Sequence, residues 1–270
     1  MKKIIIYISI MVSNCASLGA QSRELTATAN LSKGGDSIHY DFITATVPQS
    51  SSFSEQLWDF SNSKYLGQEK EVSFVGNDSN RIKMIDKDAI LDFSQDKEHL
   101  LLKRLQTPLL NIDFGNSFEY LKFPFPLNDS LVCQIEGKGT YCSKNKLVLS
   151  GTCCTKAMAK GKLIMPYNDS LNNTLLIQRN IVANIDVSND SLMSVRQDEP
   201  MKFNAAIFEW YAMEYRYPIL KVIEAAIKKG ERKVLDQFFA YLFMSVEEIG
   251  VLHASFFFTL HPSPFGSECR

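Results

Sequence analysis

The sequence lacks the motifs that mark the common enzyme classes. Its six cysteines include no Cys-x-x-Cys pair, and its four histidines form neither His-x-His nor His-Glu-x-x-His. It has no Gly-x-Ser-x-Gly nucleophile elbow and no phosphate-binding loop. The missing ligand spacing predicts no metal site and no cofactor, and no catalytic residue can be named. The paired carboxylates of a glycosidase are defined by their separation in space, so a carbohydrate-active hydrolase stays as an alternative.

The chain also lacks an excess of charge and a second long apolar segment. Lys and Arg number 29 against 30 Asp and Glu, a balance that leaves no electrostatic footprint for nucleic acid. A membrane-spanning helix needs about 20 apolar residues, whereas the runs 238–244 and 254–260 have seven each. We therefore expect neither a nucleic-acid partner nor a transmembrane span.

The first residues carry the clearest positive signal. The basic pair Lys2-Lys3 precedes an apolar run over 4–12, and small residues lead up to Ala20. This order is typical of a secretory signal peptide. We expect residues 1–20 to be cleaved, leaving 27 basic and 30 acidic residues and a net charge of −3. The protein is then exported to the periplasm, the outer-membrane surface or the extracellular medium. The residues up to Cys15 resemble a lipoprotein box, so a lipid anchor on that cysteine is the alternative.

Five cysteines remain after cleavage. Cys133 and Cys142 flank the turn-rich segment 136–139, which makes them the candidate disulfide in an oxidising compartment. The odd number leaves at least one thiol free or bonded to another molecule. Cys153 and Cys154 are adjacent and would point to opposite faces of a strand, so one of them is expected to be a small buried residue.

Aromatic content and strand patterning predict a mostly β fold. A hydrophobic content of 45% with 18 Phe and 10 Tyr indicates a well-filled core. Residues 37–42 alternate, with Ile38, Tyr40 and Phe42 on one face. From residue 130 onward, short β-prone runs are separated by turn signals. The pattern predicts an antiparallel sandwich or a barrel-like sheet of short strands.

The same pattern sets the expected boundaries. Residues 21–34 are polar and are predicted to be a flexible segment. Residues 35–250 form the β-rich domain, with a division into two sub-domains near residue 127 as an alternative. Within it, residues 219–243 fit either two short helices or a β-hairpin, because periodicity does not decide between them. Residues 251–270 are predicted to be an irregular tail.

Asp-Ser followed by an apolar residue occurs four times, mostly within a recurring Asn-Asp-Ser. Such tripeptides form Asx turns between strands, because the Asn or Asp side chain bonds its own backbone. The pattern also resembles the O-glycosylation acceptor of exported proteins of the Bacteroidota, and a modifying enzyme needs an exposed turn. The candidate acceptors are Ser37, Ser130, Ser170 and Ser191.

Two other clusters are candidate sites. Trp210, Tyr211 and Tyr215 could form a sugar-stacking surface, although aromatic side chains dominate cores and we expect packing to account for most of them. The aspartates within 86–92 lack the glycine and the later glutamate of a calcium loop. We interpret them as a solvated turn.

Four segments, in this order, carry a resemblance to a known family: Trp58-Asp59-Phe60-Ser61; Phe123-Pro124-Phe125 with Asp129-Ser130; Gly161–Pro166; and Trp210-Tyr211-Ala212 with Tyr215-Arg216-Tyr217-Pro218. The chain resembles exported β-rich proteins of gut and oral Bacteroidota for which no activity is known. The resemblance covers most of residues 30–245. It implies an all-β domain and favours the hairpin for 219–243, and it transfers no site residue.

The sequence therefore predicts an exported β-domain that is a non-enzymatic binding or structural protein. Glycans and envelope proteins are its candidate partners. Besides the hydrolase, the alternative is an accessory or cargo protein of an outer-membrane secretion pathway.

Overall fold

The structure is a computed structural model that describes residues 24–46, 56–78, 80–166, 169–188, 201–212 and 215–244. The predicted signal peptide, Cys15, Ser191 and the tail 251–270 lie outside these residues. No helix in the described part is long and apolar enough to cross a membrane. The elements are α2 (Ala27–Asn30) and the strands β1 (Glu24–Leu25), β2 (Ser37–Ile43), β3 (Gln56–Asp59), β4 (Tyr65–Asp78), β5 (Arg81–Ile85), β6 (Ile90–Gln95), β7 (His99–Gln106), β8 (Leu110–Lys122), β9 (Phe125–Pro126), β10 (Ser130–Tyr141), β11 (Asn145–Ile164), β12 (Ser170–Ser188), β13 (Met201–Tyr211), β14 (Leu220–Lys229) and β15 (Arg232–Met244).

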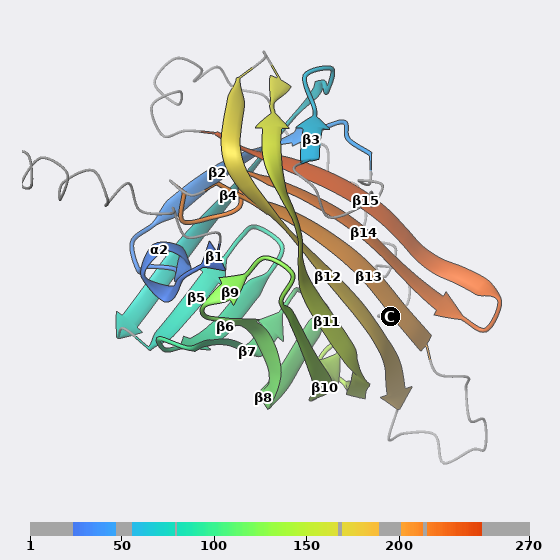
Figure 1. Ribbon diagram of the computed structural model, residues 1–270. Coiled ribbons are helices and arrows are strands. Elements are labelled where there is room, and N and C mark those ends of the chain that lie inside the picture. The colour runs from blue at the N-terminus through green and yellow to red at the C-terminus, as the bar shows by residue number, and fades with distance from the viewer. Residues whose placement is uncertain are drawn as a thin grey trace, which may run out of the picture.

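Twelve of the described strands form a closed antiparallel β-barrel (Figure 1). Around the barrel they follow the order β2-β4-β5-β6-β7-β8-β10-β11-β12-β13-β14-β15, and β15 pairs back onto β2. The predicted mostly-β, barrel-like antiparallel sheet is confirmed, and the sandwich is not formed. Strands on both sides of residue 127, β8 and β10 among them, belong to one sheet. The longest strands, β11 and β12, have 20 and 19 residues and are not short.

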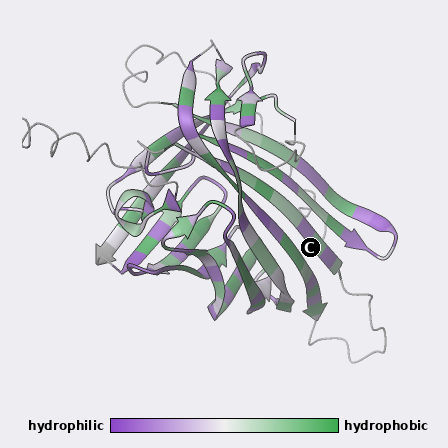
Figure 2. Ribbon diagram, viewed as in Figure 1, coloured by the Kyte–Doolittle hydropathy of each residue, from purple (hydrophilic) through white to green (hydrophobic). Residues whose placement is uncertain are grey.

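Side chains alternate between a mostly apolar inner face and a mostly polar outer face. On β12, Ile177, Ile181 and Ala183 face the interior, whereas Gln178 and Asn180 face outward. Figure 2 shows this alternation as hydrophobic and hydrophilic bands along the strands. Burial of the inner rows is the main force that closes the barrel.

The ambiguous segment 219–243 forms a hairpin. Strands β14 and β15 pair antiparallel along their length and turn at Gly230, whose φ of 56° suits a residue without a side chain. Ile223 and Ile227 alternate onto the inner face. The β-hairpin alternative is therefore confirmed.

Strands β11 and β12 extend past the barrel and, with β3, cover part of its outer face. A bulge after Ala157 on β11 changes which side chains face inward, and β3 pairs in parallel with residues 161–164. Beneath this cover lies an apolar cluster. Its centre is Trp210, which is 0% exposed and whose ring centroid lies 6.2 Å from that of Trp58 and 5.4 Å from that of Phe60.

The N-terminal segment crosses one end of the barrel, called here the plugged end. Leu25 is 4% exposed and packs with residues of β8, β10, β11, β12 and β13, while β1 pairs with β9. Helix α2 follows, capped by the Thr26 hydroxyl. Asn30 then donates to the carbonyl oxygens of Tyr215 and Arg216 in the β13–β14 loop, at 3.4 and 3.3 Å.

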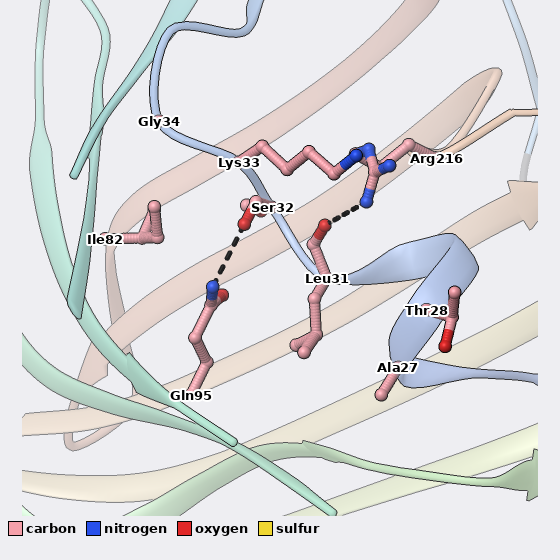
Figure 3. Close-up of a pocket in the computed structure, with 9 residues that line it drawn as sticks. All are labelled: Ala27, Thr28, Leu31, Ser32, Lys33, Gly34, Ile82, Gln95 and Arg216. Atoms are coloured by element: carbon pink, nitrogen blue, oxygen red, sulfur yellow. Dashed lines mark hydrogen bonds between the residues drawn. The ribbon is translucent and has the colours of Figure 1, made fainter. Parts of the chain in front are cut away.

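Hydrogen bonds from two sides hold the rest of this segment (Figure 3). The Gln95 amide on β6 donates to the Ser32 carbonyl oxygen at 3.0 Å, and the Arg216 guanidinium donates to that of Leu31. Gln95 and Arg216 reach the segment from opposite sides in Figure 3. The structure thus differs from the predicted flexible segment 21–34, because the described residues 24–34 are tied to both sides of the barrel rim.

The barrel closes at a narrow seam between β8 and β10. These strands pair directly only over residues 110–113 and 138–141. The approach is so close that a Cβ atom on Gly139 would lie 1.8 Å from the Asn111 carbonyl oxygen. Toward the plugged end the two strands separate, and the pair β1–β9 packs there.

Candidate functional site

The end opposite the plug, called here the far end, carries the turns at 86–89, 107–109, 142–144 and 230–231. None of these short described turns crosses it. Near the far end several inner apolar side chains are only half-buried, although Ile112 and Leu147 there are 3% and 2% exposed. Toward the plug, Phe125 and Ile177 are 0% exposed. In an eight-stranded barrel the side chains alone can fill the interior. A twelve-stranded barrel has a wider interior. The half-buried apolar residues, called here the far-end lining, are Met84, Leu91, Leu105, Leu110, Ile185, Val187 and Phe203.

A cluster of three charged side chains lies in the middle of the interior. Arg179 on β12, Glu209 on β13 and Lys221 on β14 face inward on adjacent strands. Glu209 Oε2 accepts from Arg179 Nη1 at 3.0 Å, and Glu209 Oε1 lies 2.7 Å from Lys221 Nζ. Across the barrel, Arg179 Nη2 donates to the Tyr120 carbonyl oxygen at 3.2 Å, and the guanidinium lies 3.6 Å from the centroid of that ring.

The two cations set the protonation of Glu209. Burial by itself would raise the pKa of this carboxyl group, but Lys221 and Arg179 outweigh it and lower the pKa to about 2. The same attraction outweighs the effect of burial on Lys221 and raises its pKa. All three groups are therefore charged at neutral pH.

Tyrosines surround this cluster as neutral hydrogen-bond donors. Burial raises the pKa of Tyr120 and of Tyr211, and it raises that of Tyr241 to about 12. Within the described part of the chain, none of these three phenol groups has a hydrogen-bond partner. Tyr40 differs, since its hydroxyl donates to the Pro218 carbonyl oxygen at 3.5 Å. The interior therefore contains polar groups that its own strands do not satisfy.

A second ion pair lies closer to the far end. Lys70 Nζ on β4 lies 2.8 Å from Asp86 Oδ2 and 5.2 Å from the centroid of the Tyr241 ring. The Asp86 side chain is only 5% exposed and so differs from the predicted solvated turn, whereas Asp88 in the same turn is exposed. Lys70 and Lys221 face the interior, yet their side chains are 28% and 25% exposed. Both lysine side chains are therefore only partly buried.

The cysteines do not pair as predicted. Cys133 is a free thiol aligned with Cys153 on the neighbouring strand, whereas Cys142 lies in the turn after β10 and is disulfide-bonded elsewhere. Nine residues of strand separate the two predicted partners, about 30 Å, so they cannot meet. The hydrogen bond between the Cys133 and Cys153 thiols lowers the pKa of Cys153, with a smaller contribution from Arg179, and raises the pKa of Cys133. Cys153 is buried and Cys154 half-buried on the outer face, as their alternation predicts.

The candidate sugar-stacking residues do not share a surface. Trp210 is buried in the outer cluster, Tyr211 faces the interior at 9% exposure, and Tyr215 lies in a loop against Phe243. No ligand can stack on Trp210 in this arrangement. In the described residues, no three His, Cys, Asp or Glu side chains are grouped so as to hold a metal ion.

Three of the candidate glycosylation acceptors lie within the described residues. Ser37, Ser130 and Ser170 are exposed, and each is the first residue of its strand at the plugged end. The Asp129 carboxylate accepts from the backbone N–H of the next residue, Ser130, at 2.7 Å, whereas an Asx turn bonds the N–H two residues on. Their exposure is compatible with modification, which stays a prediction.

A hollow of about 420 Å³ lies beside the plug, lined partly by Lys33 and Arg216 (Figure 3). Its arginine is already engaged, because Arg216 Nε lies 3.6 Å from Asp36 Oδ2 and the guanidinium donates to the backbone of Leu31. These contacts anchor the plug. The barrel interior is thus the stronger candidate site.

Sequence reasoning did not identify the interior charges. The sequence does contain a signal for these charges: in an alternating strand, a charged residue occupies a position where the neighbouring inward positions are apolar or aromatic. Examples are Ile177-x-Arg179-x-Ile181 and Ile207-x-Glu209-x-Tyr211. Such a residue faces the core and needs a partner there. Which strands supply the partners depends on the barrel order.

Fold and site together define the class: a closed antiparallel β-barrel with an apolar inner surface, a plug at one end and a cationic cluster in its interior. Compared with known protein families, characterised proteins and solved structures, the chain matches none.

Proposed function

We propose that this protein is a non-enzymatic binding protein that takes an apolar or amphiphilic ligand into the barrel through the far end. The far-end lining carries this proposal, because its apolar side chains face inward and remain half-buried. Apolar surface that folding leaves accessible in a concave site is the usual feature of a small-molecule pocket. A ligand would complete its burial.

The carboxyl groups favour binding over hydrolysis. A glycosidase needs one carboxylic acid whose pKa is raised so that it can donate a proton. In the described residues, every carboxyl group with a shifted pKa is shifted downward: Asp59, Asp96, Asp129 and Glu209. Glu209, the carboxylate at the centre of the interior, is held by two cations and is no proton donor.

We further propose that the protein acts outside the cytoplasm, as the signal sequence over residues 1–20 suggests. Fractionation of the native host and the intact mass of the mature chain test this directly. Cleavage after Ala20 is expected, and retention of residues 1–20 in the cytoplasmic fraction would contradict it. The same spectra report acylation of Cys15 and glycosylation at Ser37, Ser130 or Ser170.

Ligand uptake is tested with N-phenyl-1-naphthylamine, a neutral probe that fluoresces in apolar surroundings. We expect saturable binding by the purified protein. Val187→Lys places a charge in the far-end lining and should weaken binding about tenfold or more, because an ammonium group would have to be buried beside the probe. Val148→Lys is the matched control, since Val148 lies on the outer face of β11 and is 45% exposed.

Two results would contradict the proposal. One is the absence of saturable binding by the wild-type protein. The other is an equal loss of binding in both valine variants, which would place the probe on the outer surface.

A further inference from the structure

We infer that the ligand carries one negative charge, and that this anionic head group binds at Lys221 beside Arg179 while its single apolar chain extends toward the far end. The ligand class is a long-chain amphiphile with a monoanionic head, such as a fatty acid. This inference rests on the proposed function, because it identifies the ligand of the same interior.

The charge of the interior cluster is the first argument. Arg179 and Lys221 are cations that share the single carboxylate of Glu209, at 3.0 and 2.7 Å. Lys70 and Asp86 form a separate neutral pair at 2.8 Å. These five groups carry a net charge of +1; the other acidic groups beside them are the Cys153 thiol, whose pKa is lowered by the hydrogen bond with the neighbouring thiol and by Arg179, and Asp88, which is exposed in the turn next to Tyr241. An unpaired charge inside a protein is costly, and one monoanion would balance it.

The unused donors are the second argument. An ammonium group has three donors, and the only partner of Lys221 in the described part is Glu209. Among the described residues, Arg179 Nε is buried without a partner. In the described part of the chain, the hydroxyl groups of Tyr211 and Tyr241 also have no partner, and they are not among the fully buried unpartnered atoms. Donors without partners can bind an acceptor, and an ionised carboxylate is an acceptor only.

The direction of the apolar chain follows from the strands. From Lys221 toward the far end, β14 turns Ile223 and Ile227 inward, and the neighbouring β15 adds Leu235 and Phe239. The path from Lys221 to Ile227 covers six residues, roughly 20 Å of strand. That length suits a long acyl chain and exceeds a short organic acid.

Calorimetric titration of the purified chain tests the inference with three probes: oleate, its neutral ester methyl oleate, and the short anion butyrate. We expect oleate to bind about tenfold more tightly than methyl oleate, the size of one charged hydrogen bond. Butyrate should bind far more weakly. Lys221→Met should weaken oleate binding about tenfold and leave methyl oleate within about twofold of wild type.

Two controls separate charge from folding. Lys156→Met removes an exposed lysine from the outer face of β11 and should leave oleate binding unchanged. If Lys221→Met does not fold, Tyr241→Phe provides a second test because it removes only the phenol donor. It should weaken the binding of oleate and leave the binding of methyl oleate unchanged.

The outcomes distinguish the two proposals. If neither oleate nor methyl oleate binds, the proposed function itself fails. If both bind equally well to the wild-type protein, the proposed function stands and the anionic head group is refuted. Butyrate binding as tight as that of oleate would identify a small free anion as the ligand. It would contradict the inference that the ligand is a long-chain amphiphile.

Discussion

Replacing Glu209 with Gln removes the carboxylate that contacts both Arg179 and Lys221 in the barrel interior. The substitution keeps the size of the side chain but leaves two cations without a counter-charge. Removal of one partner from a buried ionic cluster costs about 3–5 kcal/mol of folding free energy. We therefore expect Glu209→Gln to lower the free energy of unfolding at pH 7 by about that amount.

The pH dependence gives a second estimate of the same energy. The pKa of Glu209 in the folded protein is about 2, below its ordinary value of 4.5. A lowered pKa means that the ionised group stabilises the fold above pH 4.5, and that this contribution disappears as the pH falls through 2. The difference corresponds to roughly 3 kcal/mol. The stability gap between wild type and variant should therefore close in acid.

The assay is urea-induced unfolding followed by circular dichroism, at pH 7 and at stepwise lower pH. Glu224→Gln is the matched control, because Glu224 is exposed on the outer face of β14, and it should change the stability by less than about 0.5 kcal/mol. Should Glu209→Gln not fold, the triple variant Arg179→Met, Glu209→Leu, Lys221→Met removes all three charges and should fold. A Glu209→Gln variant as stable as wild type at pH 7, or a gap that persists in acid, would refute the reasoning.

Three further predictions concern other parts of the barrel. In the native protein, a maleimide should label Cys154 much faster than Cys153, which is 1% exposed. Peptide mass mapping shows which of the two thiols is labelled first, and equal labelling rates would contradict the burial of Cys153. Gly139→Ala should prevent folding or unfold the seam, since its Cβ would lie 1.8 Å from the Asn111 carbonyl oxygen; native circular dichroism and thermal stability in this variant would argue against the close approach. Trp210→Ala should cost about 3–5 kcal/mol in urea unfolding, and a loss below about 1 kcal/mol would show that Trp210 is not in a core.

The strands could be predicted from the sequence because each carries its own period. Ile38, Tyr40 and Phe42 alternate, and they form one inner row of β2. The period of residues 219–243 does not distinguish a hairpin from helices, because Ile223 and Ile227 are four residues apart and suit a helix as well as an inward row on β14. Neighbouring strands decide that choice, and they are distant in sequence.

The plug and the interior cluster could not be predicted. Residues 24–34 are mostly polar. Their conformation is fixed by hydrogen bonds to remote parts of the chain, such as the Gln95 side chain and the carbonyl groups of the loop at 215–216. The cysteine pairing failed for a related reason. A turn-rich segment suggested that Cys133 and Cys142 face each other, whereas the strand register places Cys133 opposite Cys153.

A crystal structure of the protein with bound oleate tests the central claim most directly. We predict one ligand inside the barrel, with a carboxylate oxygen about 3 Å from Lys221 Nζ and the chain along Ile223 and Ile227 toward the far end. Density for the ligand on the outer surface, or a head group at the far end with the chain toward Arg179, would contradict the account.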